Sequence, residues 1–327
     1  MNVEDQILTY LKLHFEASPK EMTDSIGVSK QIIHRVLAKL IEAGDIEKTG
    51  RAPKVYYRLK EKVKTQPGIA NAISETEKSF LQANFNLFTE TGNQLEGIEA
   101  FEKWCARQNL PLQKTITEYI KTREKYLAYY GNKNLINGTE KLVNTKAFAR
   151  VCIDEMYYGD FYAIERFGKT KIGNLIHFAK QAQQKTLMEQ ICVLLKEKLE
   201  ALIASKNIDA VGYIPPTIKR EVQIMSYFKK SFNLSAPHIN LKKVSGIIPI
   251  PQKALSKIED RISNANASIV VDDKRIFNRI LLIDDAVGSG ATINETACKI
   301  KYKKLAAQVI GFAVVGSFKG FDVIQEV

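Results

Sequence analysis

The chain lacks the features that mark zinc ribbons, disulfide-rich domains, secreted proteins and membrane proteins. It has 327 residues and only four cysteines, with no C-x-x-C pair among them: Cys105, Cys152, Cys192 and Cys298. Cysteines so widely scattered argue against a zinc ribbon and against a disulfide framework. Lys12, His14 and Glu16 interrupt the first twenty residues, which therefore hold no signal-peptide core, and no apolar run approaches the roughly 18 residues of a membrane span. We therefore expect a cytoplasmic protein with reduced thiols and no membrane association.

Negative charge is also in short supply. The chain has 36 acidic residues against 48 lysines and arginines, a formal net charge of +12. An excess of this size suits a polyanionic partner such as nucleic acid, although many soluble proteins are mildly basic without one. Hydrophobic residues make up 45% of the chain, enough for two or three domains with cores of their own.

Residues 1–64 have the pattern of three short helices followed by a hairpin. Apolar residues recur at helical spacing from Val3 to Phe15, and Ser18, Pro19 and Glu21 predict the capped start of a second helix that ends at Gly27. A third helix is predicted from the Ser29 cap to Gly44, and two short helices joined by a glycine turn are typical of a helix-turn-helix. The following segment, "DIEKTGRAPKVYYRLK", predicts a β-hairpin. The whole stretch resembles the winged-helix domains of bacterial transcription regulators.

The charged residues of this segment lie where a winged helix contacts DNA. Near the start of the third helix, Lys30, Gln31, His34 and Arg35 are predicted on the outer face, the positions that reach base edges in the major groove. Arg51 and Lys54 stand in the predicted wing, in a run of basic residues suited to phosphate contacts. We therefore expect residues 1–64 to bind DNA or another nucleic acid. The alternative is a protein-binding module whose lysines are only solvated.

Residues 65–150 are predicted to be a helical connector domain that begins with a linker. Its aromatic residues, Trp104, Tyr119, Tyr126, Tyr129 and Tyr130, have the chemistry to stack on unpaired bases. Aromatic residues in helical segments more often form a core or an interface, and we favour that interpretation.

Residues 151–327 alternate apolar strands with amphipathic helices. Strands are predicted at 210–214, 238–244, 279–283 and 309–315, and helices at 187–202, 222–232 and 292–304. Such alternation predicts a multidomain chain that ends in an α/β domain with a parallel sheet covered by helices on both faces. Ligands of these sheets bind beyond the carboxyl ends of the strands.

One such strand end, "RILLIDDAVGSGATINE" (Arg279–Glu295), carries the clearest candidate site. The strand runs into Asp284 and Asp285, and a glycine loop then leads into a helix, so that backbone N–H groups and hydroxyls can surround a tetrahedral anion. The residues expected to do so are Val287, Gly288, Ser289, Gly290, Ala291 and Thr292. Two carboxylates would repel a phosphate, so they must face another group. A ribose 5-phosphate fits both parts of the site, because its 2′- and 3′-hydroxyls can donate to the carboxylates while its 5′-phosphate reaches the loop.

Competing loop types fit less well. A P-loop needs a lysine after its last glycine, where this chain has Ala291, and the third glycine of a dinucleotide fingerprint is missing. A response-regulator acid pocket would explain the aspartates but not the loop. An ordinary strand-loop-helix turn would explain neither the acid pair nor its register with the glycines.

The stretch "ILLIDDAVGSGAT" resembles the phosphoribosyl pyrophosphate (PRPP) signature of type I phosphoribosyltransferases, and residues 152–327 resemble the competence protein F (ComF) family. "YYGDFYAIERFGKTKIGNLIHFAK", "IPPTIKREVQ" and "PQKALSKIEDRISN" are similar to further segments of that family. The resemblance implies that Asp284 and Asp285 are the catalytic carboxylates on the ribose hydroxyls and that Val287–Thr292 bind the 5′-phosphate. It also implies a pyrophosphate loop and a flexible loop over the site. Their residues would be Pro215, Pro216, Thr217, Lys219 and Arg220 for the first loop, and Gln252, Arg261 and Asn264 for the second.

Two departures leave the activity open. The cysteine-rich zinc module usual in the family is missing, and Ala286 and Val287 follow the aspartates where a bulky residue often begins the loop. A winged helix joined to this fold also resembles the purine repressors of Gram-positive bacteria, in which the PRPP site senses and does not catalyse. The sequence thus predicts a DNA-associated protein that binds PRPP or a related nucleotide with Mg²⁺, as a phosphoribosyltransferase or as a sensor. A third class is an effector or assembly component of a DNA-uptake or anti-phage defence system, acting as an oligomer or in a larger complex.

Overall fold

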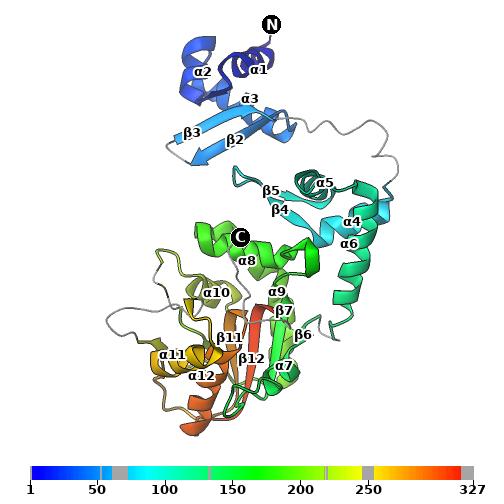
Figure 1. Cartoon of the computed structure of the whole chain (residues 1–327). Helices are drawn as coiled ribbons and strands as arrows, with labels where there is room; N and C mark the ends of the chain where they lie inside the picture. Colours follow the sequence, from blue (N-terminus) through cyan, green and yellow to red (C-terminus); the bar gives the residue numbers. More distant parts are fainter. Residues whose placement is uncertain are drawn as a thin grey trace. The chain divides into compact units, whose positions relative to one another are not determined.

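The computed structural model describes residues 2–51, 54–60, 73–131, 134–216, 218, 220–244 and 254–317. The chain forms two compact units, one of Met1–Ala72 with Thr89–Asn93 and the other of Ile73–Phe88 with Gln94–Val327. Figure 1 shows the elements of both units. Within the described residues, no helix combines the length and apolarity needed to cross a membrane.

The N-terminal unit contains three helices and a small antiparallel sheet. Its elements are α1 (Val3–His14), β1 (Glu16–Ala17), α2 (Pro19–Ile26), α3 (Lys30–Glu42), β2 (Ile46–Arg51) and β3 (Lys54–Leu59). The strand order is β1-β3-β2, so the predicted hairpin is present and gains a third strand that the sequence did not predict. The helices enclose a core of their own, which includes Ile7, Leu11, Met22, Ile33 and Leu37.

Local capping explains where these helices begin. Ser18 and Glu21 form the predicted capping box, in which the Ser18 N–H donates to Glu21 Oε2 at 2.7 Å and the Glu21 N–H donates to Ser18 Oγ at 3.3 Å. The Ser29 side chain accepts a hydrogen bond from the N–H of Ile32 at the start of α3. Gly27 ends α2 with a φ of 74°, a backbone conformation that favours glycine.

The larger unit is built on a five-stranded, mostly parallel sheet, as the α/β prediction required. The strand order is β6-β7-β12-β11-β8, and only β6 is antiparallel to its neighbour. The strands are β6 (Ile136–Asn137), β7 (Glu155–Phe161), β8 (Ala210–Tyr213), β11 (Phe277–Val287) and β12 (Ala306–Gly316). The sequence did not predict β7. The predicted strand at 238–244 forms only in part: His238 bridges to Val211, while β9 (Leu241–Lys243) pairs with β10 (Ile269–Val271) in a separate two-stranded sheet.

Helices cover both faces of this sheet. Alternate side chains of β11 point to opposite faces: Leu281 and Ile283 join the core of α8, α9 and α10, whereas Ile280 and Leu282 join the core of α11 and α12. The helices are α8 (Lys171–Ala182), α9 (Lys185–Lys206), α10 (Ile224–Phe232), α11 (Ile258–Ser268) and α12 (Ala291–Tyr302).

The predicted connector packs into the same unit. Its elements are α4 (Glu75–Asn84), β4 (Asn86–Phe88), β5 (Gln94–Glu96), α5 (Gly97–Arg107), α6 (Leu112–Leu127), β6 and α7 (Thr139–Val143). On α6, Arg123 forms a buried ion pair with Asp160 of β7 at 3.0 Å. Four of the five aromatic residues singled out above pack inward, as favoured: Tyr119 is buried, and Trp104, Tyr126 and Tyr130 pack against the core. Tyr129, in contrast, is 49% exposed.

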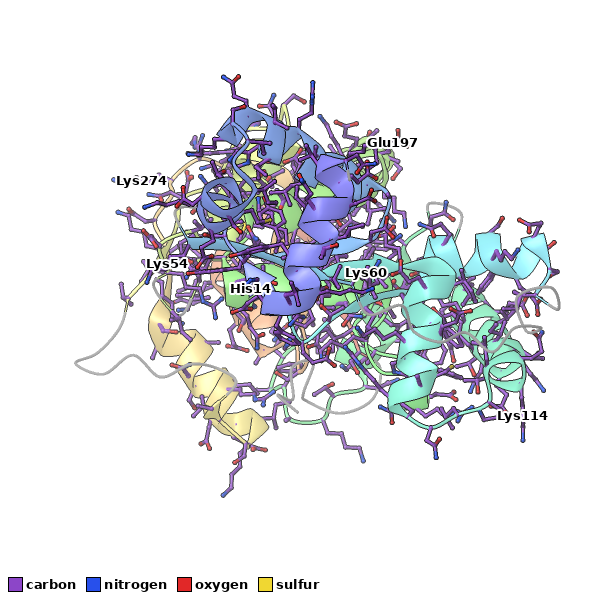
Figure 2. The ribbon with its side chains drawn as sticks, turned by 90° about the horizontal axis from the view of Figure 1, so that it is seen from above. His14, Lys54, Lys60, Lys114, Glu197 and Lys274 are labelled. Carbon is purple, nitrogen blue, oxygen red and sulfur yellow. A yellow bond between two sulfur atoms is a disulfide. The ribbon has the colours of Figure 1, made fainter. Side chains whose placement is uncertain are left out.

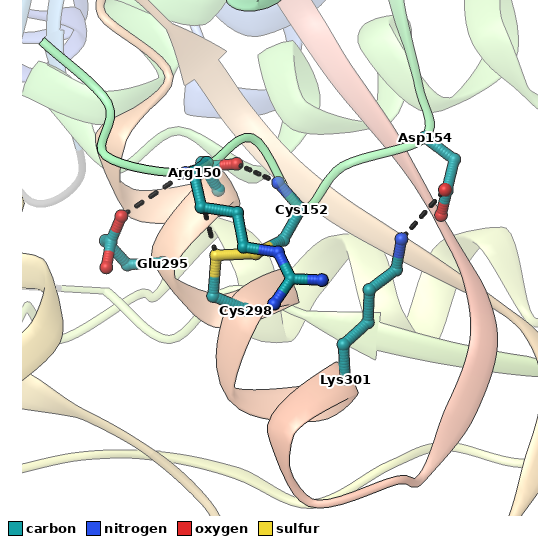
Figure 3. The surroundings of a disulfide bond; sticks show 7 residues. Arg150, Cys152, Asp154, Glu295, Cys298 and Lys301 are labelled. Atoms are coloured by element: carbon teal, nitrogen blue, oxygen red, sulfur yellow. Dashed lines mark hydrogen bonds and ion pairs between the residues drawn. A yellow bond between two sulfur atoms is a disulfide. The ribbon is translucent and has the colours of Figure 1, made fainter.

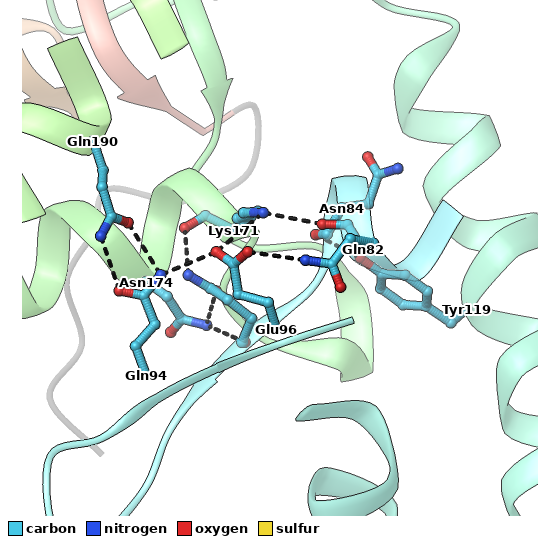
Figure 4. Close-up of polar contacts among 9 residues, drawn as sticks. Gln82, Asn84, Gln94, Glu96, Tyr119, Lys171, Asn174 and Gln190 are labelled. Atoms are coloured by element: carbon cyan, nitrogen blue, oxygen red, sulfur yellow. Dashed lines mark hydrogen bonds and ion pairs between the residues drawn. The ribbon is translucent and has the colours of Figure 1, made fainter. Parts of the chain in front are cut away.

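Polar contacts also join this segment to α8 (Figure 4). Lys171 forms an ion pair with Glu96 at 3.1 Å and donates to the Gln82 carbonyl oxygen at 3.0 Å. Asn174 donates to the backbone oxygen of Asn86 at 3.1 Å and to its side-chain oxygen at 3.0 Å. The segment before residue 150 therefore contacts the helix that covers the sheet.

Candidate functional site

The candidate site lies where three neighbouring parallel strands end. β11 runs between β12 and β8, and Asp284 is paired in register with Ala313 of β12. Just after β8, the Ile214 N–H donates to the Ile283 oxygen at 2.8 Å. The chain therefore leaves β8 beside the acid pair, and Pro215 and Pro216, which the resemblance assigns to a pyrophosphate loop, follow at this edge.

The two carboxylates belong to opposite faces of the sheet. Strand alternation places Asp285 on the face of Ile283, where α8 packs, and Asp284 on the face of Leu282, where α12 packs. On the first face, Lys180 of α8 forms an ion pair with Asp285 at 2.8 Å, and the two side chains are only 20% and 16% exposed. Asp285 is thus already held by a protein cation.

Asp284 is in a different electrostatic position. Burial, reinforced by repulsion from Asp285, raises its pKa above the usual range, and the Asp285 N–H and Lys180 oppose this rise only in part. The Asp285 N–H donates to Asp284 Oδ1 at 2.8 Å. Within the described part of the chain, no lysine or arginine forms an ion pair with Asp284. A partly buried carboxylate without its own cation is suited to accept hydrogen bonds from a ligand.

The glycine loop adopts the expected turn into α12. Gly290 caps the helix with a φ of 82°, and its oxygen accepts a hydrogen bond from the Asn294 N–H at 2.9 Å. The Ser289 hydroxyl accepts a hydrogen bond from the Ala291 N–H at 3.4 Å. The first N–H groups of a helix have no intrahelical acceptor, so Thr292 and Ile293 present donors at this end. The loop therefore has the form of an anion cradle.

Helix α7 packs against this loop, which the sequence did not predict. A Cβ added to Gly290 would lie 2.1 Å from Leu142 Cδ2. Next to it, Lys141 donates from Nζ to the Gly288 oxygen at 2.6 Å and also to the Ser317 oxygen. Burial lowers the pKa of Lys141 to about 8. No sequence signal pointed to Lys141, because 147 residues separate it from Gly288. Lys180, in contrast, is the lysine of the ComF-like segment "NLIHFAK".

The remaining residues implied by the resemblance are described only in part. Thr217 and Lys219 of the pyrophosphate loop and Gln252 of the flexible loop lie outside the described residues, and Arg220 is partly buried. Arg261 and Asn264 lie on α11 and not on a loop. The Arg261 side chain is buried, and its Nε donates to the Leu255 oxygen at 2.7 Å.

In the N-terminal unit, the candidate nucleic-acid residues are accessible. All four side chains of the predicted recognition face on α3 are exposed: Lys30, Gln31, His34 and Arg35. Lys54 is exposed at the start of β3 and is labelled in Figure 2. Arg51 ends β2, and its side chain lies outside the described residues. Arg58, in contrast, forms an ion pair with Glu47 on the neighbouring strand.

The expectation of reduced thiols throughout is wrong for two cysteines. Cys152 and Cys298 form a disulfide with a Cα–Cα distance of 5.0 Å (Figure 3). The sequence could not reveal this pair because 146 residues separate the partners, which meet only when α12 packs beside the segment before β7. Cys105 and Cys192 are free and buried, and burial raises their thiol pKa values to about 11 and about 12.

No protein-family model matches the chain, and no curated protein sequence is significantly similar to it. The resemblance to type I phosphoribosyltransferases and to the ComF family therefore rests on the sequence motifs alone.

Proposed function

We propose that the protein binds PRPP or a related ribose 5-phosphate at the carboxyl end of β11, and that ligand binding is coupled to nucleic-acid binding by a winged helix-turn-helix in the N-terminal unit. One observation carries the proposal. Asp284, a partly buried carboxylate with a raised pKa and no ion-pair partner among the described residues, lies a few residues before a glycine turn that caps a helix. An acceptor for sugar hydroxyls thus stands next to donors for a phosphate, at the sheet edge where α/β proteins bind ligands.

The two aspartates would have different roles. Asp284 would accept hydrogen bonds from the ribose hydroxyls. Asp285 would contribute to ligand binding only through its negative charge, which the ion pair with Lys180 partly neutralises. The backbone N–H groups of Gly288–Thr292 would bind the 5′-phosphate, and the Lys141 ammonium next to Gly288 would add positive charge.

Mg²⁺ would arrive with the ligand. Among the described residues, no group of three or more His, Cys, Asp or Glu side chains could hold a metal by itself. Magnesium commonly binds to one or two protein carboxylates and to the phosphates of its substrate, and Asp284 fits that need. When bound, the ion would neutralise pyrophosphate charge, and the carboxylates would stabilise positive charge on the ribose.

The second candidate function is a PRPP sensor without turnover. The observation in its favour is the exposed polar face of α3, which would serve as a DNA-binding surface whose affinity a ligand could regulate. The enzyme and the sensor would use the same binding site, so ligand binding and turnover need separate measurements.

Calorimetry on the full chain tests the site. With MgCl₂ present, wild type should bind PRPP, and Asp284→Asn should bind it more weakly. Pyrophosphate release with a panel of nucleobases then separates the two functions, because a sensor releases none. Failure of wild type to bind PRPP with Mg²⁺ would overturn the proposal.

DNA binding with and without PRPP tests the coupling. Lys54→Gln should weaken binding to all DNA sequences alike, and Arg35→Ala should reduce sequence preference. Lys39→Gln is a matched control, because Lys39 is also exposed on this unit but is paired with Glu4 at 2.8 Å. If wild type binds no DNA even at low salt, the N-terminal unit has another role.

A further inference from the structure

The segment before β7 holds α12 through a buried asparagine. Asn294 is fully buried, and its Nδ2 donates to the Arg150 oxygen at 2.9 Å. Its Oδ1 accepts a hydrogen bond from the Cys152 N–H at 2.8 Å. Both polar atoms of the side chain are therefore used to join α12 to residues 150–152.

The same asparagine contacts the glycine loop. Its backbone N–H donates to the Gly290 oxygen at 2.9 Å, so one residue connects the loop to the segment before β7. Cys298 follows Asn294 by four positions and lies on the same side of α12, where it forms the disulfide with Cys152. The bond and the asparagine thus fasten adjacent turns of α12 to the same segment, residues 150–152.

We propose that the Cys152–Cys298 bond and Asn294 together form a redox-responsive brace, that is, a pair of links that fix α12 and the glycine loop before it (Gly288–Gly290) to residues 150–152. With the bond formed, α12 is fixed to residues 150–152, and Asn294 holds Gly290 in its cap conformation. With the bond reduced, the first turn of α12 and the glycine loop are more mobile. Binding of an anion must then also order the loop, which lowers the affinity. Asn294 is then a positioning residue. The ligand part of this inference rests on the proposed function.

The accessibility of the four cysteines supports a bond that can open and close. Cys298 is only partly buried, whereas Cys152 is 3% exposed, so Cys298 is the more accessible of the two partners for a small thiol or disulfide. Cys105 and Cys192 are buried, with raised pKa values that keep them in the unreactive thiol form. Oxidation should therefore be confined to one pair.

The chemistry is ordinary thiol–disulfide exchange with a low-molecular-weight disulfide such as oxidised glutathione. The Cys298 thiolate attacks one sulfur of the oxidant and releases a glutathione thiolate. The Cys152 thiolate then displaces the second glutathione from the mixed disulfide. The two protein thiols lose two protons and two electrons, and the oxidant becomes two glutathione thiols. A dithiol reductant reverses both steps.

The experiment compares the full chain after oxidised glutathione and after a dithiol reductant. Alkylation followed by mass spectrometry reports whether the bond forms. Hydrogen exchange of the amides of residues 288–293 then reports on the loop, and it should be slower in the oxidised protein. Titration with inorganic phosphate should give an affinity about three- to tenfold higher in the oxidised protein, the range expected when one flexible group no longer has to be ordered.

Two variants separate this brace from a cross-link that only adds stability. Cys298→Ser should make exchange and phosphate affinity independent of the oxidant, whereas Cys105→Ser should keep the full dependence. Asn294→Ala should raise exchange at residues 288–293 even with the bond formed.

Each outcome decides a different statement. If both cysteines remain alkylatable after oxidation, or if exchange at residues 288–293 is equal in the two states, the brace is overturned while the proposed ligand site stands. If exchange differs but neither state binds phosphate or PRPP, the brace is supported and the proposed function fails.

Discussion

Replacing Asp284 and Asp285 one at a time should have opposite effects on stability, although the two residues are neighbours with the same side chain. Asp285→Asn removes the carboxylate from an ion pair with Lys180 whose side chains are 16% and 20% exposed. Removing one partner costs about 3–5 kcal/mol in a fully buried pair and ~1 kcal/mol or less in an exposed one. For this mostly buried pair we expect a loss of about 1–3 kcal/mol.

Asp284→Asn should leave stability unchanged or raise it by about 1 kcal/mol, because one unit of pKa shift corresponds to about 1.4 kcal/mol. The pKa of Asp284 is raised by burial and by Asp285, so its charged form destabilises the fold. A carboxyl with a raised pKa favours the folded state at low pH, and this contribution is lost as pH rises through the folded-state pKa. Asp284→Asn should remove that part of the pH dependence.

Function should follow the reverse order. If PRPP binds to the Asp284 carboxylate as proposed, PRPP affinity in wild type should increase as pH rises through the raised pKa. Asp284→Asn should weaken PRPP binding by about tenfold or more, since a hydrogen bond to a charged group contributes about 1.5–3 kcal/mol. In an enzyme, turnover should fall further, by about two orders of magnitude.

Urea unfolding and calorimetry on the same samples measure both quantities. Equal losses of stability in the two variants, or a larger loss in Asp284→Asn, would contradict the assignment of the two aspartates to different faces and partners.

Three further outcomes follow from the packing around the loop. Gly290→Ala should lose about 2–4 kcal/mol of stability, because the residue has a left-handed φ and its Cβ would meet Leu142. In a urea-unfolding double-mutant cycle, adding Leu142→Ala should recover part of this loss. Simple additivity of the two changes would refute the clash. Lys141 has its pKa lowered to about 8, so stability should rise between about pH 8 and its ordinary value of 10.5, and thermal unfolding of Lys141→Met should show no such rise. Arg123→Met should destabilise the larger unit by about 3–5 kcal/mol in guanidinium unfolding, because it leaves Asp160 buried without its cation, and a loss below about 1 kcal/mol would count against that role.

Local signals allowed the N-terminal unit to be predicted almost completely. Ser18 with Glu21, and Ser29 at the start of α3, make bonds within three residues, which the sequence displays directly. The added strand β1 was not predictable from its own two residues. It exists because Glu16 and Ala17 pair with Arg58 and Tyr57 some forty residues later, an interaction that local propensity does not encode.

The sequence predicted the residues of the candidate site that are contiguous in the chain, but not those that distant segments bring to it. The strand, the acid pair and the glycine turn are contiguous, and the structure forms them in that order, except that β11 continues through both aspartates to Val287 and does not end at Ile283. Lys180, Lys141 and Leu142 arrive from distant segments, and the same is true of Cys152 opposite Cys298. A sequence indicates which groups lie next to one another on a strand or loop, and tertiary packing decides which cation pairs with which carboxylate.

The division of the acid pair also suggests how ligand binding is transmitted. A ligand that draws on Asp285 must compete with Lys180, which is part of α8. Four residues of that helix make polar contacts with the rest of the larger unit: Lys171, Asn174, His177 and Lys180. Among them, Asn174 donates to both the backbone oxygen and the side-chain oxygen of Asn86. Asn86 lies in the segment that leads back along the chain to the N-terminal unit. If a bound ligand shifts α8, these bonds would carry the shift to Asn86.

This route can be tested with a matched pair of variants. Asn174→Ala removes both bonds to Asn86, whereas Gln190→Ala removes a side-chain contact of α9 with Gln94 at 3.0 Å and leaves α8 intact (Figure 4). If wild type shows a PRPP effect on DNA affinity, of about fivefold or more for a typical coupling, Asn174→Ala should reduce it without changing PRPP affinity, and Gln190→Ala should preserve it. Fluorescence anisotropy of labelled DNA with and without PRPP gives the coupling, and calorimetry gives the PRPP affinity. Equal effects of the two variants would show that α8 is not the element that transmits the ligand, because the bonds of α8 and α9 to the same segment would then be interchangeable.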